Sequence, residues 1–291
     1  MKSSILHEVK YSVFKSGNPL YQFIAINVGV FLLINLLFVV EFLAGNAGAI
    51  TNQLERQLSV PSDYSSLATR PWTLFTYMFT QREFFHLLFN MLWLFWLGNI
   101  FLDFLNKRQF IFAYLLGGLV GGICYLLIYN YIPVFRNDAQ FVFLLGSSGS
   151  VMAIVVGAAT LLPDYSIRML FFGNVKLKYL ALVFIILDLI GIAGRNPGGS
   201  LSHLGGALVG FLFISQLQKG RDWSKMFARK KKPKLQVTRN EEPKVSATVS
   251  RSIPNQEYID TILDKISQSG YDKLTKEEKE ALFKASKQDQ N

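Results

Sequence analysis

Residues 144–157, which read LLGSSGSVMAIVVG, combine the composition of a loop with that of a membrane helix. Three serines and two glycines stand together near the start of the stretch, and this density normally marks a loop. The remainder is apolar, and Gly149, Ala153 and Gly157 repeat at every fourth position. Small residues at this spacing let a second helix approach closely in lipid. The stretch therefore predicts a tightly packed membrane helix that carries serine hydroxyls, Ser148 among them.

The composition of the whole chain indicates a membrane protein with a soluble tail. The 291 residues are 51% hydrophobic and 17% charged, whereas soluble domains are about 25% charged. Residues 1–218 hold 13 Lys and Arg and nine Asp and Glu, too few to cover a surface exposed to water. The first 19 residues are polar and lack the apolar core of a signal peptide, so we expect the first apolar segment to be a retained anchor.

Six apolar segments approach the length of about 20 residues that a helix needs to cross the hydrocarbon layer. They are residues 21–44, 84–104, 109–131, 140–162, 178–194 and 200–217. We therefore expect an all-α bundle of six membrane spans. Lys and Arg are enriched in cytoplasmic segments, and placing the N-terminus inside puts most of them, with the RKKKPK cluster at 229–234, on the cytoplasmic side. We predict a multi-pass protein of the cell (inner) membrane with both termini in the cytoplasm.

Strongly polar side chains inside a membrane span are costly, so each is a candidate for function, and four of them stand out. His86 and Asn90 are four residues apart in the second span, which puts them on one helix face. Ser148 lies in the fourth span and His203 in the sixth. At 1.5 Å per residue, all four lie within about 10 Å of each other in depth, in the outer half of the membrane.

These groups are the ones that a serine hydrolase needs. A serine becomes a nucleophile when a neighbouring base, such as a neutral histidine, takes its proton. Amide, imidazole and backbone N–H groups can stabilise the resulting oxyanion. Taken singly, each residue is explained as well by helix packing, and Ser147 and Ser150 are equal candidates for the nucleophile. The common depth of the four groups makes the catalytic interpretation as good as the packing one.

A second face of small residues explains how the serine and the histidine can meet. Gly206 and Gly210 lie three and seven residues after His203 on the sixth span. Packing this face against the small-residue face of the fourth span would bring the Ser148 hydroxyl toward the imidazole.

Other intramembrane chemistries have weaker support. The H-E-x-x-H motif of zinc proteases is absent, and two histidines without a partnering carboxylate make a poor metal site. Asp188 is a single acid in the fifth span, whereas an aspartyl protease needs a pair, so we interpret it as a helix–helix hydrogen bond. A transporter with a broken helix would predict inverted repeats, which the two halves do not show. We expect neither a metal nor a cofactor.

Three motifs resemble those of the rhomboid intramembrane serine proteases, and the resemblance covers about residues 20–217. They are H-x-x-x-N in the second span, G-x-S-G in the fourth and H-x-x-G-x-x-x-G in the sixth. The matching residues are His86 and Asn90, then Gly146, Ser147, Ser148 and Gly149, then His203, Gly206 and Gly210. The flanking stretches RPWTLFTYMFTQREFFHLLFNMLWLFWLGNIF and AYLLGGLVGG are also similar to family members.

The resemblance implies an intramembrane serine endopeptidase with a dyad of Ser148 and His203. It also implies an oxyanion hole formed by His86, Asn90 and the Ser148 N–H. Substrates would be transmembrane helices of membrane proteins, cut near the outer face of the lipid bilayer, with no nucleic-acid partner. The alternative is an inactive rhomboid-like protein that binds transmembrane clients without cutting them.

Two positions depart from the family pattern. Trp72 is followed by Thr73 where family members often have arginine, which bears on the stability of the first outer loop. Met152 stands where an aromatic ring often stacks on the histidine, and a thioether can pack there instead.

The tail is expected to hold two parts after the membrane domain of residues 1–218. Residues 219–252 are basic and poor in apolar residues, which predicts a flexible linker. Residues 253–287 then predict a cytoplasmic helical hairpin, with Ile259, Ile262, Leu263 and Ile266 on one face, a stop at Gly270, and a capping box from Thr275 to Glu278. So small a hairpin buries little core, so we expect it to dock onto an unidentified partner.

Overall fold

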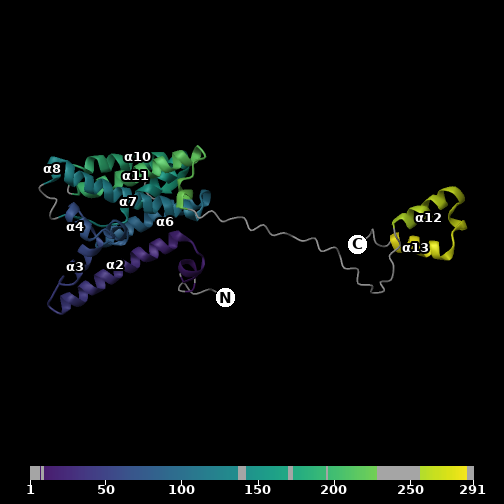
Figure 1. The fold of residues 1–291 in the computed structure, drawn as a ribbon, viewed down its shortest axis with the longest axis horizontal. Coiled ribbons are helices and arrows are strands. Elements are labelled where there is room, and N and C mark those ends of the chain that lie inside the picture. The colour runs from purple at the N-terminus through teal and green to yellow at the C-terminus, as the bar shows by residue number, and fades with distance from the viewer. Residues whose placement is uncertain are drawn as a thin grey trace. The chain divides into compact units, whose positions relative to one another are not determined.

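The computed structural model describes residues 7, 10–136, 142–169, 173–194, 196–227 and 256–286. The chain divides into two compact units, Met1–Lys230 and Lys231–Asn291. The first unit is a bundle of helices (Figure 1). Its main helices are α2 (Pro19–Leu43), α6 (Phe84–Phe104), α7 (Lys107–Tyr131), α9 (Ser148–Leu161), α10 (Leu177–Gly191) and α11 (Pro197–Gln218).

Four of these helices, α2, α6, α7 and α11, are long and apolar enough to cross a membrane. The other two, α9 and α10, have 14 and 15 residues and are shorter than a usual span. The expected all-α membrane fold is confirmed, and the count of six spans stays a prediction.

Short elements connect the main helices. They are η1 (Tyr11–Lys15), α3 (Thr51–Leu58), α4 (Tyr64–Thr69), α5 (Thr73–Thr76), η2 (Tyr77–Phe79), α8 (Pro133–Arg136) and η3 (Trp223–Phe227). Two small antiparallel ribbons pair β1 (Val60–Pro61) with β2 (Phe143–Leu144), and β3 (Ser166–Met169) with β4 (Gly173–Lys176). The elements from α3 to η2 make up most of the long connection between α2 and α6. In this connection Thr73 is fully buried and its hydroxyl donates to the Arg70 carbonyl at 2.7 Å.

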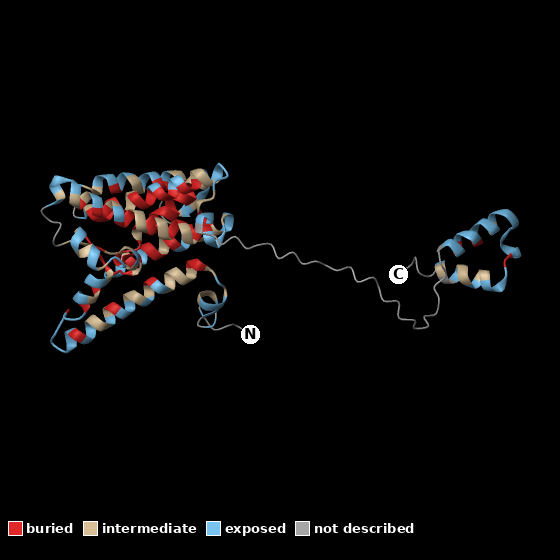
Figure 2. Ribbon diagram, in the orientation of Figure 1, coloured by how far each residue is buried: buried red, intermediate tan, exposed pale blue. Residues whose placement is uncertain are grey.

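The centre of the first unit is buried (Figure 2). Here α9 is buried at every position from Gly149 to Ala159, and all of these residues except Ser150 are apolar. Glycines let α11 and α7 approach its backbone. A Cβ added to Gly206 of α11 would lie 1.9 Å from the Gly149 carbonyl oxygen. A Cβ added to Gly117 of α7 would lie 2.3 Å from the Cβ of Ala153. The serine-bearing helix is therefore enclosed by α7 and α11.

The start of α9 differs from the expected span of 140–162. The helix begins at Ser148, and Phe143–Leu144 before it are extended because β2 pairs with β1. Gly146 has a φ of +120° and its N–H donates to the Tyr77 carbonyl at 3.0 Å. Only glycine adopts such a backbone readily. The loop-like composition of the opening stretch thus marks a real turn, and Ser148 occupies the helix N-terminus rather than the helix interior.

The second unit is a helical hairpin of α12 (Gln256–Ser269), η4 (Tyr271–Lys273) and α13 (Lys276–Ser286). Ile259 and Ile262 are buried, whereas Leu263, expected on the same face, is 48% exposed because so small a hairpin covers only one stripe. The expected capping box is present: the Thr275 N–H donates to Glu278 Oε2 at 2.8 Å, and the Glu278 N–H donates to Thr275 Oγ1 at 3.3 Å. Most of the expected linker at 219–252 lies outside the described residues.

The described start of that linker is folded against the bundle. Asp222 accepts from Arg108 of α7 at 3.1 Å, and the Ser224 hydroxyl accepts from the same arginine at 3.0 Å. Residues 222–224 therefore pack against α7 instead of leaving the bundle directly after α11.

Candidate functional site

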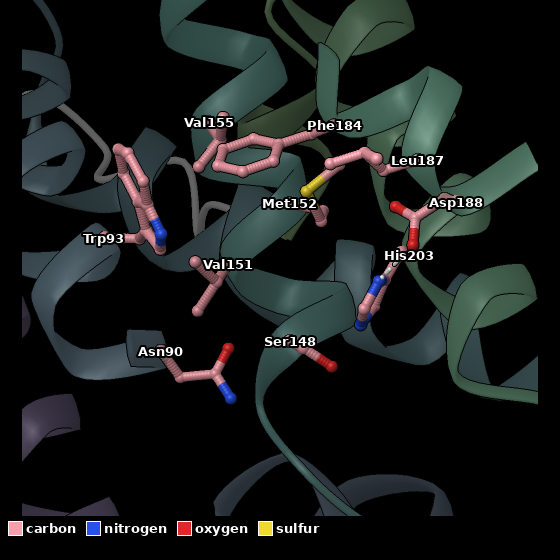
Figure 3. Close-up of a pocket in the computed structure, with 10 residues that line it drawn as sticks. All are labelled: Asn90, Trp93, Ser148, Val151, Met152, Val155, Phe184, Leu187, Asp188 and His203. Carbon is pink, nitrogen blue, oxygen red and sulfur yellow. Dashed lines mark hydrogen bonds and ion pairs between the residues drawn. The ribbon is translucent and has the colours of Figure 1, made fainter. Parts of the chain in front are cut away.

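A pocket of about 200 Å³ opens at the start of α9 (Figure 3). Four helices supply its polar side chains: α6 carries Asn90, α9 carries Ser148, α10 carries Asp188, and α11 carries His203. Its apolar walls consist of Trp93, Val151, Met152, Val155, Phe184 and Leu187. The polar groups gather at one end of the pocket, and Val155 and Phe184 lie at the other (Figure 3).

The three serines before and within α9 have different surroundings. Ser148 is half-buried and lines the pocket. Ser147 is fully buried, and its Oγ accepts from Gln81 Nε2 at 3.1 Å. Ser150 is 1% exposed and faces α7, where a Cβ on Gly118 would lie 2.4 Å from its Oγ. Of the three serines that composition left equal, the pocket contains Ser148.

The backbone at Ser148 is also suited to bind an anion. Ser148 is the first residue of α9, and the first four N–H groups of a helix have no acceptor within the helix. The partial positive charge of a helix N-terminus adds to the attraction for negative charge at this point. The Ser148 N–H is therefore available to an oxyanion that forms beside its own hydroxyl.

His203 pairs with a carboxylate, which corrects the expectation that the histidines have no such partner. Nδ1 of His203 lies 2.7 Å from Oδ1 of Asp188 (Figure 3). Asp188 does form the helix–helix hydrogen bond expected of it, and its partner in this bond is His203, the candidate base. Because α10 and α11 are antiparallel neighbours joined by a short turn, residues at similar distances from that turn lie at one level. That spacing is compatible with the pair, but it does not show which way either helix faces.

The structure brings Ser148 and His203 to one pocket without joining them. No hydrogen bond connects the Ser148 hydroxyl to His203 among the described residues, and both side chains remain open to the pocket. Met152 lines the same pocket, as does Phe184 of α10.

The two predicted oxyanion donors of α6 occupy different places. Asn90 is buried and lines the pocket, and its Nδ2 donates to Gln81 Oε1 at 3.0 Å, which leaves one amide hydrogen. His86 lies beside the turn that leads to the serine, because a Cβ on Gly146 would lie 2.7 Å from its Cε1. Asn90 therefore lines the pocket, whereas His86 contacts the loop that precedes α9.

Sequence patterns did not point to Gln81, which connects several of these groups. Its Nε2 donates to Asn27 Oδ1 of α2 at 2.8 Å and to Ser147 Oγ, and its Oε1 accepts from Asn90. Asn27 in turn donates to the Tyr114 hydroxyl at 3.3 Å. Asn27, a polar residue inside the first expected span, is a member of this buried network that the sequence analysis passed over.

The fold and the pocket together define a multi-pass helical membrane protein with a serine, a histidine and hydrogen-bond donors at the N-terminus of its central helix. Residues 68–219, just over half of the chain, match the Rhomboid domain family. The chain belongs to the rhomboid family.

Two further comparisons extend this result. The RHOMBOID-like protein 12, mitochondrial, of Arabidopsis thaliana is 30% identical over 158 residues, which are 51% of this chain and 47% of that protein. The chain thus spans about half the length of the curated relative it matches. Residues 250–288 match a family of unknown function, DUF6576. In the described ranges, no group of three or more His, Cys, Asp or Glu side chains is placed to hold a metal ion.

Proposed function

We propose that the protein is an intramembrane serine endopeptidase that cuts transmembrane helices near the outer face of the membrane. The observation that carries the proposal is the placement of Ser148, the one serine of its motif that shares a pocket with His203. Membership of the rhomboid family supports the same activity.

The reaction uses the serine as nucleophile and the histidine as base. The Ser148 oxygen attacks a peptide carbonyl while its proton passes to His203 Nε2. The negative charge on the carbonyl oxygen is stabilised by the Ser148 N–H and by donors from Asn90 and His86. Collapse of the intermediate breaks the C–N bond, and His203 returns the proton to the leaving amine. Water then hydrolyses the acyl-enzyme by the same route.

The site fits a peptide segment that comes from the membrane. The pocket walls are apolar apart from its catalytic end, and α10, which forms one wall, exposes Leu182, Val183, Ile186 and Ile190. A transmembrane helix must unwind locally before its carbonyls are free to react, since its backbone is otherwise hydrogen-bonded. Glycine and other helix-breaking residues near its outer end favour this unwinding.

The remaining assignments complete the proposal. The enzyme sits in the cell (inner) membrane, and the distribution of Lys and Arg places both termini in the cytoplasm. Its parts are a membrane domain at residues 1–218, a linker at 219–252 and a hairpin at 253–287 that binds an unidentified partner. The hairpin's exposed Tyr258, Leu263 and Phe283 support a docking role.

Cleavage of a single-span reporter in liposomes tests the proposal. Full-length protein cuts the reporter near its outer end, Ser148→Ala reduces the rate by about 10³-fold or more, and Ser147→Ala and Ser150→Ala retain cleavage. A folded wild type that binds the reporter but leaves it intact would establish an inactive rhomboid-like protein instead.

A further inference from the structure

We propose that Asp188 is a positioning residue that holds the imidazole of His203 in the orientation and tautomer needed to accept the serine proton. The inference rests on the proposed function, because it assigns a role beside the same serine and histidine. Asp188 lies on α10 and His203 on α11, and the two side chains are 12% and 27% exposed. Their 2.7 Å contact lies at the edge of the pocket that Ser148 lines.

The chemistry of the contact decides the tautomer. An ionised carboxylate only accepts hydrogen bonds, so the proton of a neutral imidazole must sit on Nδ1. Nε2 is then unprotonated, and it is the nitrogen left to face the serine. In the reaction, the Ser148 proton moves to Nε2 and later to the leaving amine. Asp188 neither takes nor releases a proton, and its charge stabilises the imidazolium that forms between the two steps.

The position of Asp188 on its helix argues for a specific role. The buried residues of α10 are Leu177, Leu180 and Ala181 near its start and Asp188 near its end. Around the acid, Leu187, Leu189 and Ile190 are each more than half exposed. A carboxylate in such an apolar segment is costly unless it has a partner, and among the described residues its side chain pairs with His203. The buried acid near the end of α10 is thus paired with the candidate base.

The same contact also holds α10 against α11. A purely structural contact of this kind would not determine the tautomer of His203, so the two roles can be distinguished. Asp188→Asn separates the two roles, because the amide keeps the size and a hydrogen bond but loses the charge. Leu180→Ala is the matched control, since it removes a buried side chain of α10 that does not touch the pocket. Asp188→Glu restores the charge on a longer side chain.

The test measures the rate at which a fluorophosphonate labels full-length protein in liposomes. In labelling, an Oγ–P bond forms, fluoride leaves and the serine proton passes to the histidine. We expect Asp188→Asn to label about 10²- to 10⁴-fold more slowly than wild type, Asp188→Glu to recover at least tenfold of that loss, and Leu180→Ala to label at nearly the wild-type rate. Equal rates for wild type and Asp188→Asn, or an equal loss in Leu180→Ala, would overturn the inference and leave the proposed function intact.

Nitrogen NMR of the imidazoles supplies a readout that does not need activity. The chain has three histidines, so His203→Ala identifies the His203 signals. We expect a protonated Nδ1 and a bare Nε2 in wild type and a mixture of tautomers in Asp188→Asn. A bare Nδ1 in wild type contradicts the inference. If the expected tautomer is found but wild type does not label, the proposed function fails while the pairing stands.

Discussion

The Gly149 carbonyl oxygen of α9 occupies the space that any side chain on Gly206 of α11 would need, because an added Cβ would lie 1.9 Å from it. Ser148 directly precedes one of these glycines, and His203 lies three residues before the other. The close approach of the two backbones is therefore what brings the hydroxyl and the imidazole to one pocket.

Gly206→Ala is expected to lower both stability and activity. The new methyl group meets backbone atoms that cannot rotate away, so α9 and α11 must separate at a cost of about 1–3 kcal/mol. Thermal unfolding in detergent and reporter cleavage measure the two effects. Gly29→Ala is the control, since nothing lies within 4 Å of a Cβ at that position of α2. Equal behaviour of the two variants would show that the contact between α9 and α11 is looser than the structure has it.

Gln81→Ala is expected to destabilise the buried hydrogen-bond network that supports the pocket. The change leaves Asn27 and Asn90 without their buried partner, and an unsatisfied buried group costs about 1–3 kcal/mol. We also expect slower reporter cleavage, because the Asn90 amide is no longer held toward the pocket. Gln53→Ala on exposed α3 is the matched control. A double-mutant cycle with Asn90→Ala should give a coupling energy, and strict additivity would contradict the network.

The C-terminal hairpin is expected to loosen in acid. The Lys265 ammonium holds the pKa of the Glu278 carboxyl below its usual value of 4.5, with help from the Thr275 N–H. A lowered pKa means that the charged form stabilises the fold at pH values above 4.5, and that this contribution is lost as the pH falls through the lowered value. Hydrogen exchange of residues 256–286 in the full chain should show less protection at pH 3 than at pH 6.

Two glutamates in the same helix turn separate this effect from general acid unfolding. Glu278→Gln should reduce protection at pH 6 and remove most of the difference between the two pH values. Glu277→Gln, a neighbouring exposed position, should behave like wild type. An unchanged pH difference in Glu278→Gln would exclude this carboxyl as its source.

The helices and the serine motif were accessible from the sequence because each depends on local signals. Apolar length located all six main helices, and the glycine spacing at Gly149, Gly206 and Gly210 indicated which faces meet. The start of α9 was not accessible, since it is set by the pairing of Phe143 with Pro61 and by the Tyr77 carbonyl, both distant in the chain. A pattern of apolar residues cannot reveal such a contact.

The partner of Asp188 and the role of Gln81 were missed for a related reason. Each depends on how a helix is rotated about its axis and on which side chain of another helix it then faces. In the sequence, Asp188 is an isolated acid, and its partner becomes evident only when α10 lies beside α11. Gln81 is likewise an ordinary loop residue in the sequence, and its role becomes evident only when α2 lies beside it. Both are tertiary facts that one sequence does not encode locally.

The central claim is that Ser148 is an activated nucleophile, and fluorophosphonate labelling of the purified full-length protein tests it most directly. The account predicts covalent labelling of wild type at Ser148, loss of labelling in Ser148→Ala and His203→Ala, and retained labelling in Ser147→Ala and Ser150→Ala. Well-folded wild type that takes up no label, or label that persists in Ser148→Ala, would contradict it.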